Sequence, residues 1–350
     1  MKKVFTLILA LVMAMSLVAC GGSSSEESSG GDGGEASGGY KIGFSNFSIG
    51  NSWRQQMEAE FIHRADELKA EGVISDYVML MADNDQAQQI DDIRSLVTQG
   101  CDAIIVSCIT ADGLNDVLEE AMDEGVVVIT FDNNATTDNI TLRVAADDYA
   151  YGQQCGEWLA EHVEDGSKII VLDGTAGTLN NENRHNGMLD AFTANSPNSE
   201  ILATVNADWD YATAKVAVEQ LLAAHPQIDG VLSQGGAMTQ AAMDAFTAAG
   251  RDLVPMTSEG NNGFLKAWVA NMENGFTSMA FVNPPYFSAL ALDKAIEALN
   301  GATFDSVDYV LTFDIITDET AADYVREDLS DAFWVNTNLP EETLQEMFGE

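Results

Sequence analysis

A short apolar run that ends on polar side chains is the first feature of this chain that could bind a small molecule. Residues Val126–Phe131 are apolar and mostly β-branched, which predicts a strand buried on both faces of a sheet. Asp132 and Asn133 follow directly. Because ligands bind at the carboxyl ends of strands in open parallel sheets, this carboxylate and this amide are placed to hydrogen-bond a ligand. The alternative is a polar turn after a core strand. Other strands that also end on polar residues favour the ligand site.

The elements that must position these side chains alternate between strand and helix from Tyr40 onward. Short apolar runs alternate with segments whose apolar residues recur at helical spacing. The series restarts after Asp148, and Pro284-Pro285 marks a later boundary, because proline neither continues a sheet nor sits deep in a helix. The pattern predicts an α/β fold of two doubly wound parallel-sheet lobes with a cleft between them.

Charge and length exclude some classes of function. The chain has 350 residues and is 46% hydrophobic, which is enough for two domains. Its 15 basic and 56 acidic residues give a net charge of −41. Such a surface repels nucleic-acid phosphates and other copies of itself, so we expect no nucleic-acid binding and a monomer.

The first 39 residues predict export rather than folded structure. Residues 1–19 read as a signal peptide, with Lys2-Lys3 before an apolar stretch too short for an ordinary membrane span. Leu17-Val18-Ala19-Cys20 resembles a lipobox, which implies cleavage before Cys20 and a lipid on its sulfur. The alternative is a secretory peptide with a chance cysteine. Residues 20–39 are the predicted linker, built of Gly, Ser, Ala, Glu and Asp after Cys20. We therefore expect a protein anchored to the outer face of the cell membrane, or a periplasmic one.

No motif of an enzyme, a metal site or a cofactor site stands out. Gly174-Thr-Ala-Gly lacks the Lys-Ser/Thr of a phosphate loop, and no Gly-x-Ser-x-Gly occurs. The histidines have no metal-ligand spacing: His63, His162, His185 and His225. Cys101, Cys108 and Cys155 predict buried inert thiols, with a Cys101–Cys108 disulfide as the alternative. We expect no catalysis, no cofactor and no metal.

A series of motifs, in their order and spacing, resembles one family. From about Tyr40 to about Leu311 the chain resembles the sugar-binding proteins of ABC transporters, in the ribose-binding-like group of the periplasmic binding protein superfamily. The motifs that carry this resemblance are Lys41-Ile-Gly-Phe-Ser, Asn51-Ser-Trp-Arg54, Gln99-Gly-Cys-Asp-Ala-Ile-Ile-Val, Val128-Ile-Thr-Phe-Asp132, Ala146-Asp-Asp, Gly174-Thr-Ala-Gly-Thr178, Ala207-Asp-Trp-Asp210 and Ala224-His-Pro.

The resemblance implies lobes built from discontinuous segments. The chain would cross a hinge three times, near Ala145, Asn283 and Leu311. An N-terminal lobe would comprise residues 40–145 and 284–311. A C-terminal lobe and tail would comprise residues 146–283 and 312–350, with Phe333-Trp334 packed on one lobe.

The resemblance also implies a set of ligand-binding residues. Asp132 matches an acid that accepts from sugar hydroxyls, Arg184 a second-lobe arginine, and Trp209 a stacking aromatic. Carboxylates, guanidinium groups and amides suit hydroxyls, which both donate and accept, and indoles cover the C–H faces of a sugar ring. The implied set is Asn51, Trp53, Arg54, Asp132, Asn133, Arg184, Trp209, Glu259 and Asn283.

Some of these positions have alternatives or depart from the family pattern. Trp53 also lies on an apolar helix face, so core packing competes with stacking. If Asn181 caps the helix that follows it, Arg184 falls in the first turn of that helix. Asn133 replaces the arginine of ribose binders. Gly235-Gly236 replaces Asn-Asp, which implies room for a larger ligand group or a water.

The implied function is capture of a monosaccharide and its delivery to an ABC transporter permease. A binding protein that signals to a membrane receptor or sensor kinase is the alternative. A sugar-responsive repressor is excluded, because a signal peptide and an acidic linker occupy the place of its basic DNA-binding headpiece. A glycosidase that uses Asp132 and Glu259 as its carboxylate pair is the enzymatic alternative.

Overall fold

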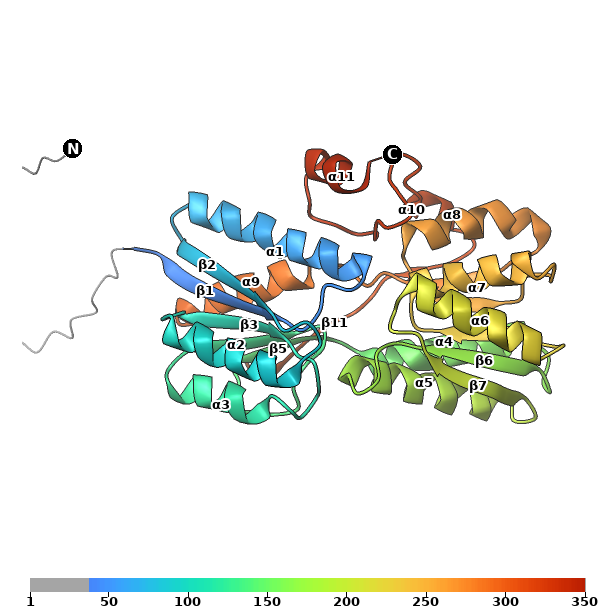
Figure 1. The fold of residues 1–350 in the computed structure, drawn as a ribbon, viewed down its shortest axis with the longest axis horizontal. Coiled ribbons are helices and arrows are strands. Elements are labelled where there is room, and N and C mark those ends of the chain that lie inside the picture. Colours follow the sequence, from blue (N-terminus) through green and yellow to red (C-terminus); the bar gives the residue numbers. More distant parts are fainter. Residues whose placement is uncertain (1–37, 350) are drawn as a thin grey trace, which may run out of the picture. The chain divides into compact units, whose positions relative to one another are not determined.

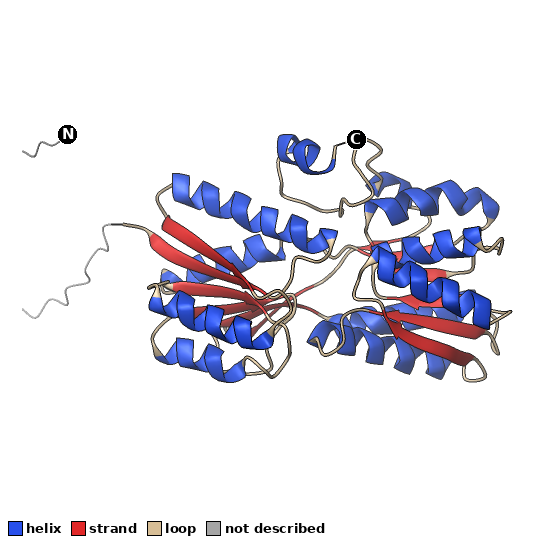
Figure 2. Ribbon diagram, viewed as in Figure 1, coloured by secondary structure: helices blue, strands red, loops and turns tan. Residues whose placement is uncertain are grey.

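The computed structural model describes residues 38–349, so the predicted signal peptide, Cys20 and most of the predicted linker lie outside the described residues. The described chain forms two lobes, each built on a six-stranded sheet (Figure 1). Helices cover both faces of each sheet (Figure 2). All strand pairs are parallel except β10 with β12 at one edge of the second sheet. The predicted fold class is confirmed.

The first sheet has the strand order β11-β5-β4-β3-β1-β2. Its strands are β1 (Tyr40–Asn46), β2 (Ile74–Met81), β3 (Ala103–Ser107), β4 (Val127–Phe131), β5 (Leu142–Ala146) and β11 (Asp308–Leu311). Its helices are α1 (Ser52–Ala70), α2 (Gln86–Thr98), α3 (Asn115–Asp123) and α9 (Phe287–Leu299). Strand β3 is buried along its whole length and β4 along nearly all of it, as a strand covered by helices on both faces must be. Strand β5 was not predicted, because its short run carries Arg143 and small alanines rather than an apolar pattern.

The second sheet has the strand order β12-β10-β9-β8-β6-β7. Its strands are β6 (Lys168–Asp173), β7 (Glu200–Asn206), β8 (Gly230–Ser233), β9 (Met256–Glu259), β10 (Ser278–Phe281) and β12 (Ile315–Ile316). Its helices are α4 (Asp148–His162), α5 (Leu179–Asn195), α6 (Tyr211–Ala224), α7 (Gly236–Ala248) and α8 (Asn262–Asn271), which a short 3-10 turn, Met272–Asn274, extends. Helix α5 begins two residues before Asn181, with Thr178 as its N-cap residue. The expectation that Asn181 caps this helix is therefore wrong, and Arg184 lies in the second turn.

The chain passes between the two sheets three times. It leaves the first sheet after β5, returns to the first lobe between β10 and α9, and leaves again between β11 and β12. The hinge crossings predicted near Ala145, Asn283 and Leu311 stay a prediction. The proline pair Pro284-Pro285 lies in the second passage, where neither a strand nor a helix continues.

The C-terminal segment, defined here as residues 317–349, contains the short helices α10 (Ala321–Tyr324) and α11 (Glu341–Phe348). It packs on both lobes, and not on one as expected. Phe333 is buried in the core of the second lobe, whereas its neighbour Trp334 is buried in the core of the first lobe. Two adjacent aromatic residues therefore belong to different hydrophobic cores.

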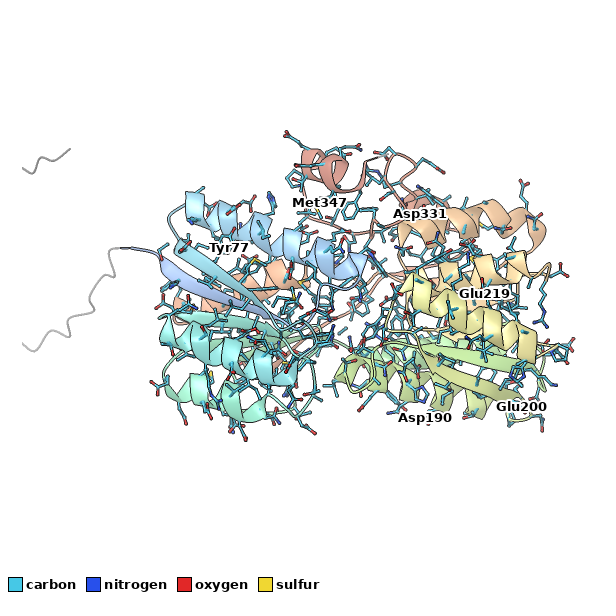
Figure 3. All side chains as sticks on the ribbon, in the orientation of Figure 1. Tyr77, Asp190, Glu200, Glu219, Asp331 and Met347 are labelled. Atoms are coloured by element: carbon cyan, nitrogen blue, oxygen red, sulfur yellow. The ribbon has the colours of Figure 1, made fainter. Side chains whose placement is uncertain are left out.

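The cysteines and the surface agree with the expectations from composition. Cys101, Cys108 and Cys155 are buried free thiols, so the alternative of a Cys101–Cys108 disulfide is wrong. Burial raises the pKa of the Cys155 thiol to about 12 and that of Cys108 still further. Exposed acids lie on the outside of the second lobe, where Figure 3 labels Asp190, Glu200 and Glu219.

Two features are absent from residues 38–349. No group of three or more His, Cys, Asp and Glu side chains in this part of the chain is arranged to hold a metal ion. None of the helices described here is long and apolar enough to cross a membrane.

Candidate functional site

A buried arginine, Arg54, lies at the switch point of the first sheet. At this point β2 pairs with one side of β1 and β3 pairs with the other side. Arg54 Nη1 donates to Asn46 Oδ1 at 3.0 Å and to Ser107 Oγ at 3.2 Å. Asn46 and Ser107 are the paired last residues of β1 and β3. Arg54 Nη2 lies 3.2 Å from Asp132 Oδ2, and the guanidinium carbon of Arg54 lies 3.8 Å from the centre of the Phe47 ring. Arg54 is thus held over the ends of three neighbouring strands.

The second lobe repeats this arrangement with Arg184. Its Nε donates to Asp148 Oδ1 at 2.7 Å and its Nη1 to Glu259 Oε1 at 2.7 Å. Nη1 also lies 3.4 Å from the backbone oxygen of Gln234, which follows β8 at the switch point of the second sheet. Arg184 is 2% exposed, so two carboxylates compensate one guanidinium away from solvent. Each lobe therefore presents one arginine and its carboxylate partners at the same end of its sheet.

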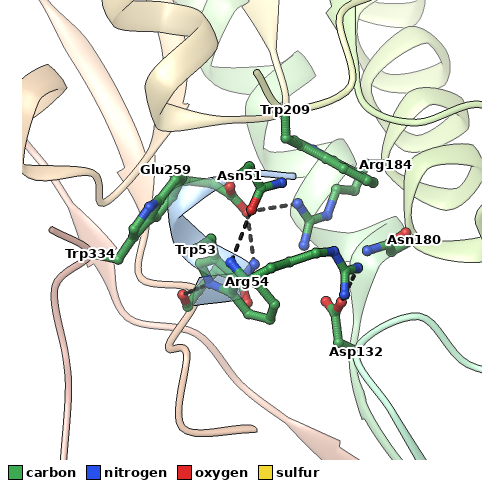
Figure 4. Close-up of a pocket in the computed structure, with 10 residues that line it drawn as sticks. Asn51, Trp53, Arg54, Asp132, Asn180, Arg184, Trp209, Glu259 and Trp334 are labelled. Atoms are coloured by element: carbon green, nitrogen blue, oxygen red, sulfur yellow. Dashed lines mark hydrogen bonds and ion pairs between the residues drawn. The ribbon is translucent and has the colours of Figure 1, made fainter. Parts of the chain in front are cut away.

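Both arginines line one pocket (Figure 4). The space between these side chains is about 330 Å³ when the open solvent at its mouth is included. Both lobes contribute side chains, and the C-terminal segment adds Trp334. The lining residues are Asn51, Trp53, Arg54, Asp132, Asn180, Arg184, Trp209, Glu259, Asn283 and Trp334. The structure thus brings together all the predicted site residues except Asn133.

The two expectations for Trp53 both describe part of its environment. Trp53 packs in the first-lobe core with Met57 and Phe61, and it also lines the pocket. Its Nε1 donates to the backbone oxygen of Asn283 at 2.9 Å, across the second passage between the lobes. The polar end of this indole is therefore occupied, and only its ring is available to a ligand.

Two pocket residues have left-handed backbone conformations, which are uncommon for residues other than glycine. Asp132 has φ of 55° and Trp209 has φ of 53°. Two hydrogen bonds fix the backbone of Asp132 in this conformation. The Asp132 N–H donates to Val144 O at 3.2 Å, and Asn134 Nδ2 donates to the backbone oxygen of Asp132 at 3.0 Å. Such conformations persist where surrounding contacts enforce them, and they concentrate at ligand sites.

The turn at Asp132 explains why Asn133 does not line the pocket. After this left-handed residue, Asn133 is buried with its Nδ2 3.3 Å from Asp132 Oδ2, and its backbone oxygen accepts from Cys108 N at 2.7 Å. Asn133 therefore supports the Asp132 carboxylate.

Each pocket carboxylate uses one oxygen for the protein and leaves the other available. Glu259 Oε1 accepts from Arg184 and, at 3.1 Å, from Asn283 Nδ2. Asp132 Oδ2 accepts from Arg54 and Asn133. Among the described residues, no side chain donates to Glu259 Oε2 or Asp132 Oδ1. Asn51 Oδ1 accepts from the Arg54 backbone N–H as a helix cap, so its Nδ2 is the atom left for a ligand.

Two buried polar atoms at the pocket have no hydrogen-bond partner within residues 38–349. They are Trp209 Nε1, a donor, and Asn283 Oδ1, an acceptor. An unpaired buried polar group costs about 1–3 kcal/mol, so it is expected to have a ligand or a water as its partner. The pocket thus combines acceptors, donors and indole faces, which suits a small polyhydroxyl compound.

Glycines make the space that Trp209 occupies. A Cβ at Gly174 would lie 2.1 Å from the Trp209 indole, and a Cβ at Gly235 would lie 2.8 Å from its Cδ1. A Cβ at Gly236 would lie 2.3 Å from the Cβ of Asn261. The expectation that Gly235-Gly236 leaves room for a larger ligand group or a water is therefore wrong, because Trp209 fills the space at Gly235 and Asn261 fills the space at Gly236.

Sequence reasoning missed two of the lining residues. Asn180 lies in the first turn of α5, and the Asn180-Asn181 pair so close to Arg184 was a usable signal. Trp334 had no such signal, because it lies in the C-terminal segment and contacts α1 from 282 residues away in sequence.

Burial shifts the ionisation of the pocket carboxylates in one direction. Desolvation raises the pKa of Asp132 and of Asp148, and it outweighs the nearby arginines, which lower these pKa values. Desolvation also raises the pKa of Glu259 to about 7, although Arg184 and Asn283 oppose it. For Arg184, burial lowers the pKa, but the charges of Asp148 and Glu259 outweigh it and the net shift is upward.

We expect Glu259→Gln to flatten the pH dependence of stability. The folded-state pKa of Glu259, about 7, lies above its ordinary value of 4.5, so Glu259 favours the folded state at low pH. That contribution is lost as pH rises through about 7. The drop in unfolding free energy from about pH 5 to about pH 8 should shrink by up to about 3 kcal/mol in the variant. Urea titrations at both pH values measure it. An unchanged drop contradicts the assignment to Glu259.

Comparison with known proteins gives three findings. A sequence profile described as "Periplasmic binding protein domain" matches residues 42–303. The ribose import binding protein RbsB of Bacillus subtilis is 24% identical over 301 residues, covering 86% of this chain and 94% of that protein. The periplasmic binding protein of the arabinose ABC transporter from Shewanella, solved with α- and β-L-arabinofuranose, has a TM-score of 0.72 at 26% identity. That match covers 81% of this chain and 93% of the other.

Proposed function

Because this chain belongs to the periplasmic binding protein domain family, we propose that it is a solute-binding lipoprotein which captures a monosaccharide and delivers it to an ABC transporter permease. The observation that carries the proposal is the pocket itself. It joins Arg54 and Asp132 from the first lobe with Arg184, Trp209 and Glu259 from the second. The arabinofuranose-bound relative has the same fold, and that relative is named for its ABC transporter.

The polar groups of the pocket suit a neutral polyhydroxyl ligand. The available oxygens of Asp132 and Glu259 would accept from hydroxyls, while the Trp209 N–H and the Asn51 amide would donate. The two guanidinium groups are already matched by three carboxylates, Asp132, Asp148 and Glu259. A further anion would therefore find no unmatched positive charge at these arginines, which favours sugars over sugar phosphates.

The same contacts favour binding over hydrolysis. Asp132 and Glu259 each serve a buried arginine, so they are committed as hydrogen-bond acceptors. We therefore propose a binding protein and not a glycosidase. Incubation with aryl glycosides should release no product, and measured turnover that is lost in Glu259→Gln contradicts this.

A sugar panel tests the proposal. We expect purified protein to bind one or more of D-ribose, L-arabinose, D-galactose, D-fructose, D-allose, xylitol and myo-inositol, with micromolar or tighter affinity, about −8 kcal/mol. Calorimetry and thermal shift measure binding, and a sugar phosphate such as ribose 5-phosphate serves as the charged control. If the protein binds none of the neutral compounds, or binds the sugar phosphate more tightly than any of them, the proposal is contradicted.

A sensing role is the second candidate. The fructose-binding periplasmic domain of a hybrid two-component system shares the fold of this chain, with a TM-score of 0.70 at 22% identity. Uptake of labelled sugar by vesicles that contain the cognate permease distinguishes the two. Uptake that depends on the added protein supports delivery. Sugar-dependent kinase activity without uptake supports sensing.

Anchoring through a lipid on Cys20 is part of the proposal and has its own test. Mass spectrometry of the protein from a lipidating host should find a diacylglyceryl-modified Cys20 at the new N-terminus. An unmodified chain cleaved elsewhere contradicts it.

A further inference from the structure

The C-terminal segment is attached to the second lobe through the N-terminus of α8. Asn262 Nδ2 donates to the backbone oxygens of Arg326 at 2.8 Å, Leu329 at 3.0 Å and Ser330 at 3.1 Å. The Asn262 N–H donates to Phe333 O at 2.8 Å. Asn262 is fully buried, so one side chain organises the loop before Trp334. This segment lies beyond the residues that match the family, 42–303.

Trp334, the residue after Phe333 in this segment, is hydrogen-bonded to α1 of the first lobe. Gln56 Nε2 donates to Trp334 O at 3.0 Å, and Trp334 N donates to Gln56 Oε1 at 2.9 Å, so one buried amide pairs both backbone groups. Trp334 Nε1 donates to Ser52 Oγ at 2.9 Å. Glu60, one turn further along α1, accepts from Thr337 Oγ1 at 2.6 Å.

These contacts determine what Trp334 presents to the pocket. Its backbone groups and its indole N–H are all bonded to α1, so it offers only its apolar ring. Figure 4 shows this ring at the pocket edge beside Trp53 and Glu259. Rigid indole faces cover the C–H groups of a sugar at a low cost in side-chain entropy.

We propose that Trp334 is a ligand-binding residue which the C-terminal segment adds to the pocket, and that the segment links the two lobes in the ligand-holding arrangement. The inference rests on the proposed function. Its ligand class is a neutral polyol or sugar with one apolar C–H face, set against Trp334 while the hydroxyls face Asp132 and Glu259. Because the segment is attached to α8 and bonded to α1, its contacts with α1 stabilise the arrangement in which the pocket is closed.

Calorimetry of three variants tests the inference, using the panel sugar that binds the wild type most tightly. Trp334→Ala should weaken binding about tenfold or more, since large aromatic anchors dominate small interfaces. It should also make the heat-capacity change of binding less negative, because less apolar surface is buried. Trp334→Phe keeps a flat ring and should stay within about threefold of the wild type. Trp158→Phe, whose ring stacks on His162 away from the pocket, is the matched control and should bind as the wild type does.

The outcomes separate this inference from the proposed function. If the wild type binds a sugar, and folded Trp334→Ala binds it with the same affinity and the same heat-capacity change, the inference alone is overturned. Equal losses in Trp334→Phe and Trp158→Phe also overturn it, because they reveal a general effect of removing an indole. If Trp334→Ala does not fold, Trp334→Phe and Trp334→Leu decide: binding retained with Phe and lost with Leu supports a ring contact, and equal binding overturns it. A wild-type chain that binds no panel sugar overturns the proposed function, and this inference with it.

Discussion

Replacing Arg184 with alanine should abolish sugar binding and lower the free energy of unfolding by about 3–5 kcal/mol. The variant leaves the carboxylates of Asp148 and Glu259 buried without the guanidinium that lies 2.7 Å from each. Removing one member of a buried ion pair is costly because the remaining buried charge loses the partner that compensated it. Since many domains have only about 5–15 kcal/mol of stability, the variant should fold but be marginal.

Chemical denaturation with and without sugar measures both effects. Arg94→Ala is the matched control, because Arg94 and its partner Glu120 are each about half exposed. Such surface pairs contribute under about 1 kcal/mol. Adding Asp148→Asn and Glu259→Gln to Arg184→Ala should recover stability without recovering binding, since the unpaired charges are then gone. A stability loss no larger than that of Arg94→Ala contradicts the role of Arg184.

Replacing Gly174 with alanine should weaken sugar binding by about tenfold to a hundredfold, at a stability cost of about 1–3 kcal/mol. The new Cβ would lie 2.1 Å from Cε2 and Cζ2 of Trp209, so the indole must leave its place. Trp209 then no longer covers the ligand, and its N–H is no longer aimed at the pocket.

A double-mutant cycle tests whether Gly174 acts through Trp209. Gly174→Ala added to Trp209→Ala should weaken binding little beyond Trp209→Ala alone, because the clash has been removed. Gly38→Ala is the control, since a Cβ there meets nothing within 4 Å. Additive losses in the double variant contradict the steric explanation.

Local pattern was sufficient for much of the fold and for the strand-end residues. The apolar run of β4 and the polar residue Asp132 after it are adjacent in sequence, so a strand and its ligand end could be predicted together. Asparagine is a favoured N-cap residue, and Asn51 Oδ1 accepts from Arg54 N at the start of α1. Strand β5 was missed because pairing with β4 and β11, rather than its composition, makes it a strand.

The sequence by itself determined the alternation of strands and helices and the polar groups at the strand ends, because these depend on neighbours a few residues apart. Only the tertiary structure decided which of those groups share a pocket. Asn133 is turned away by the left-handed backbone of Asp132, and Trp209 fills the space that Gly174 and Gly235 leave. Trp334 reaches Ser52 across 282 residues. Such contacts depend on how distant segments pack, and no local spacing encodes them.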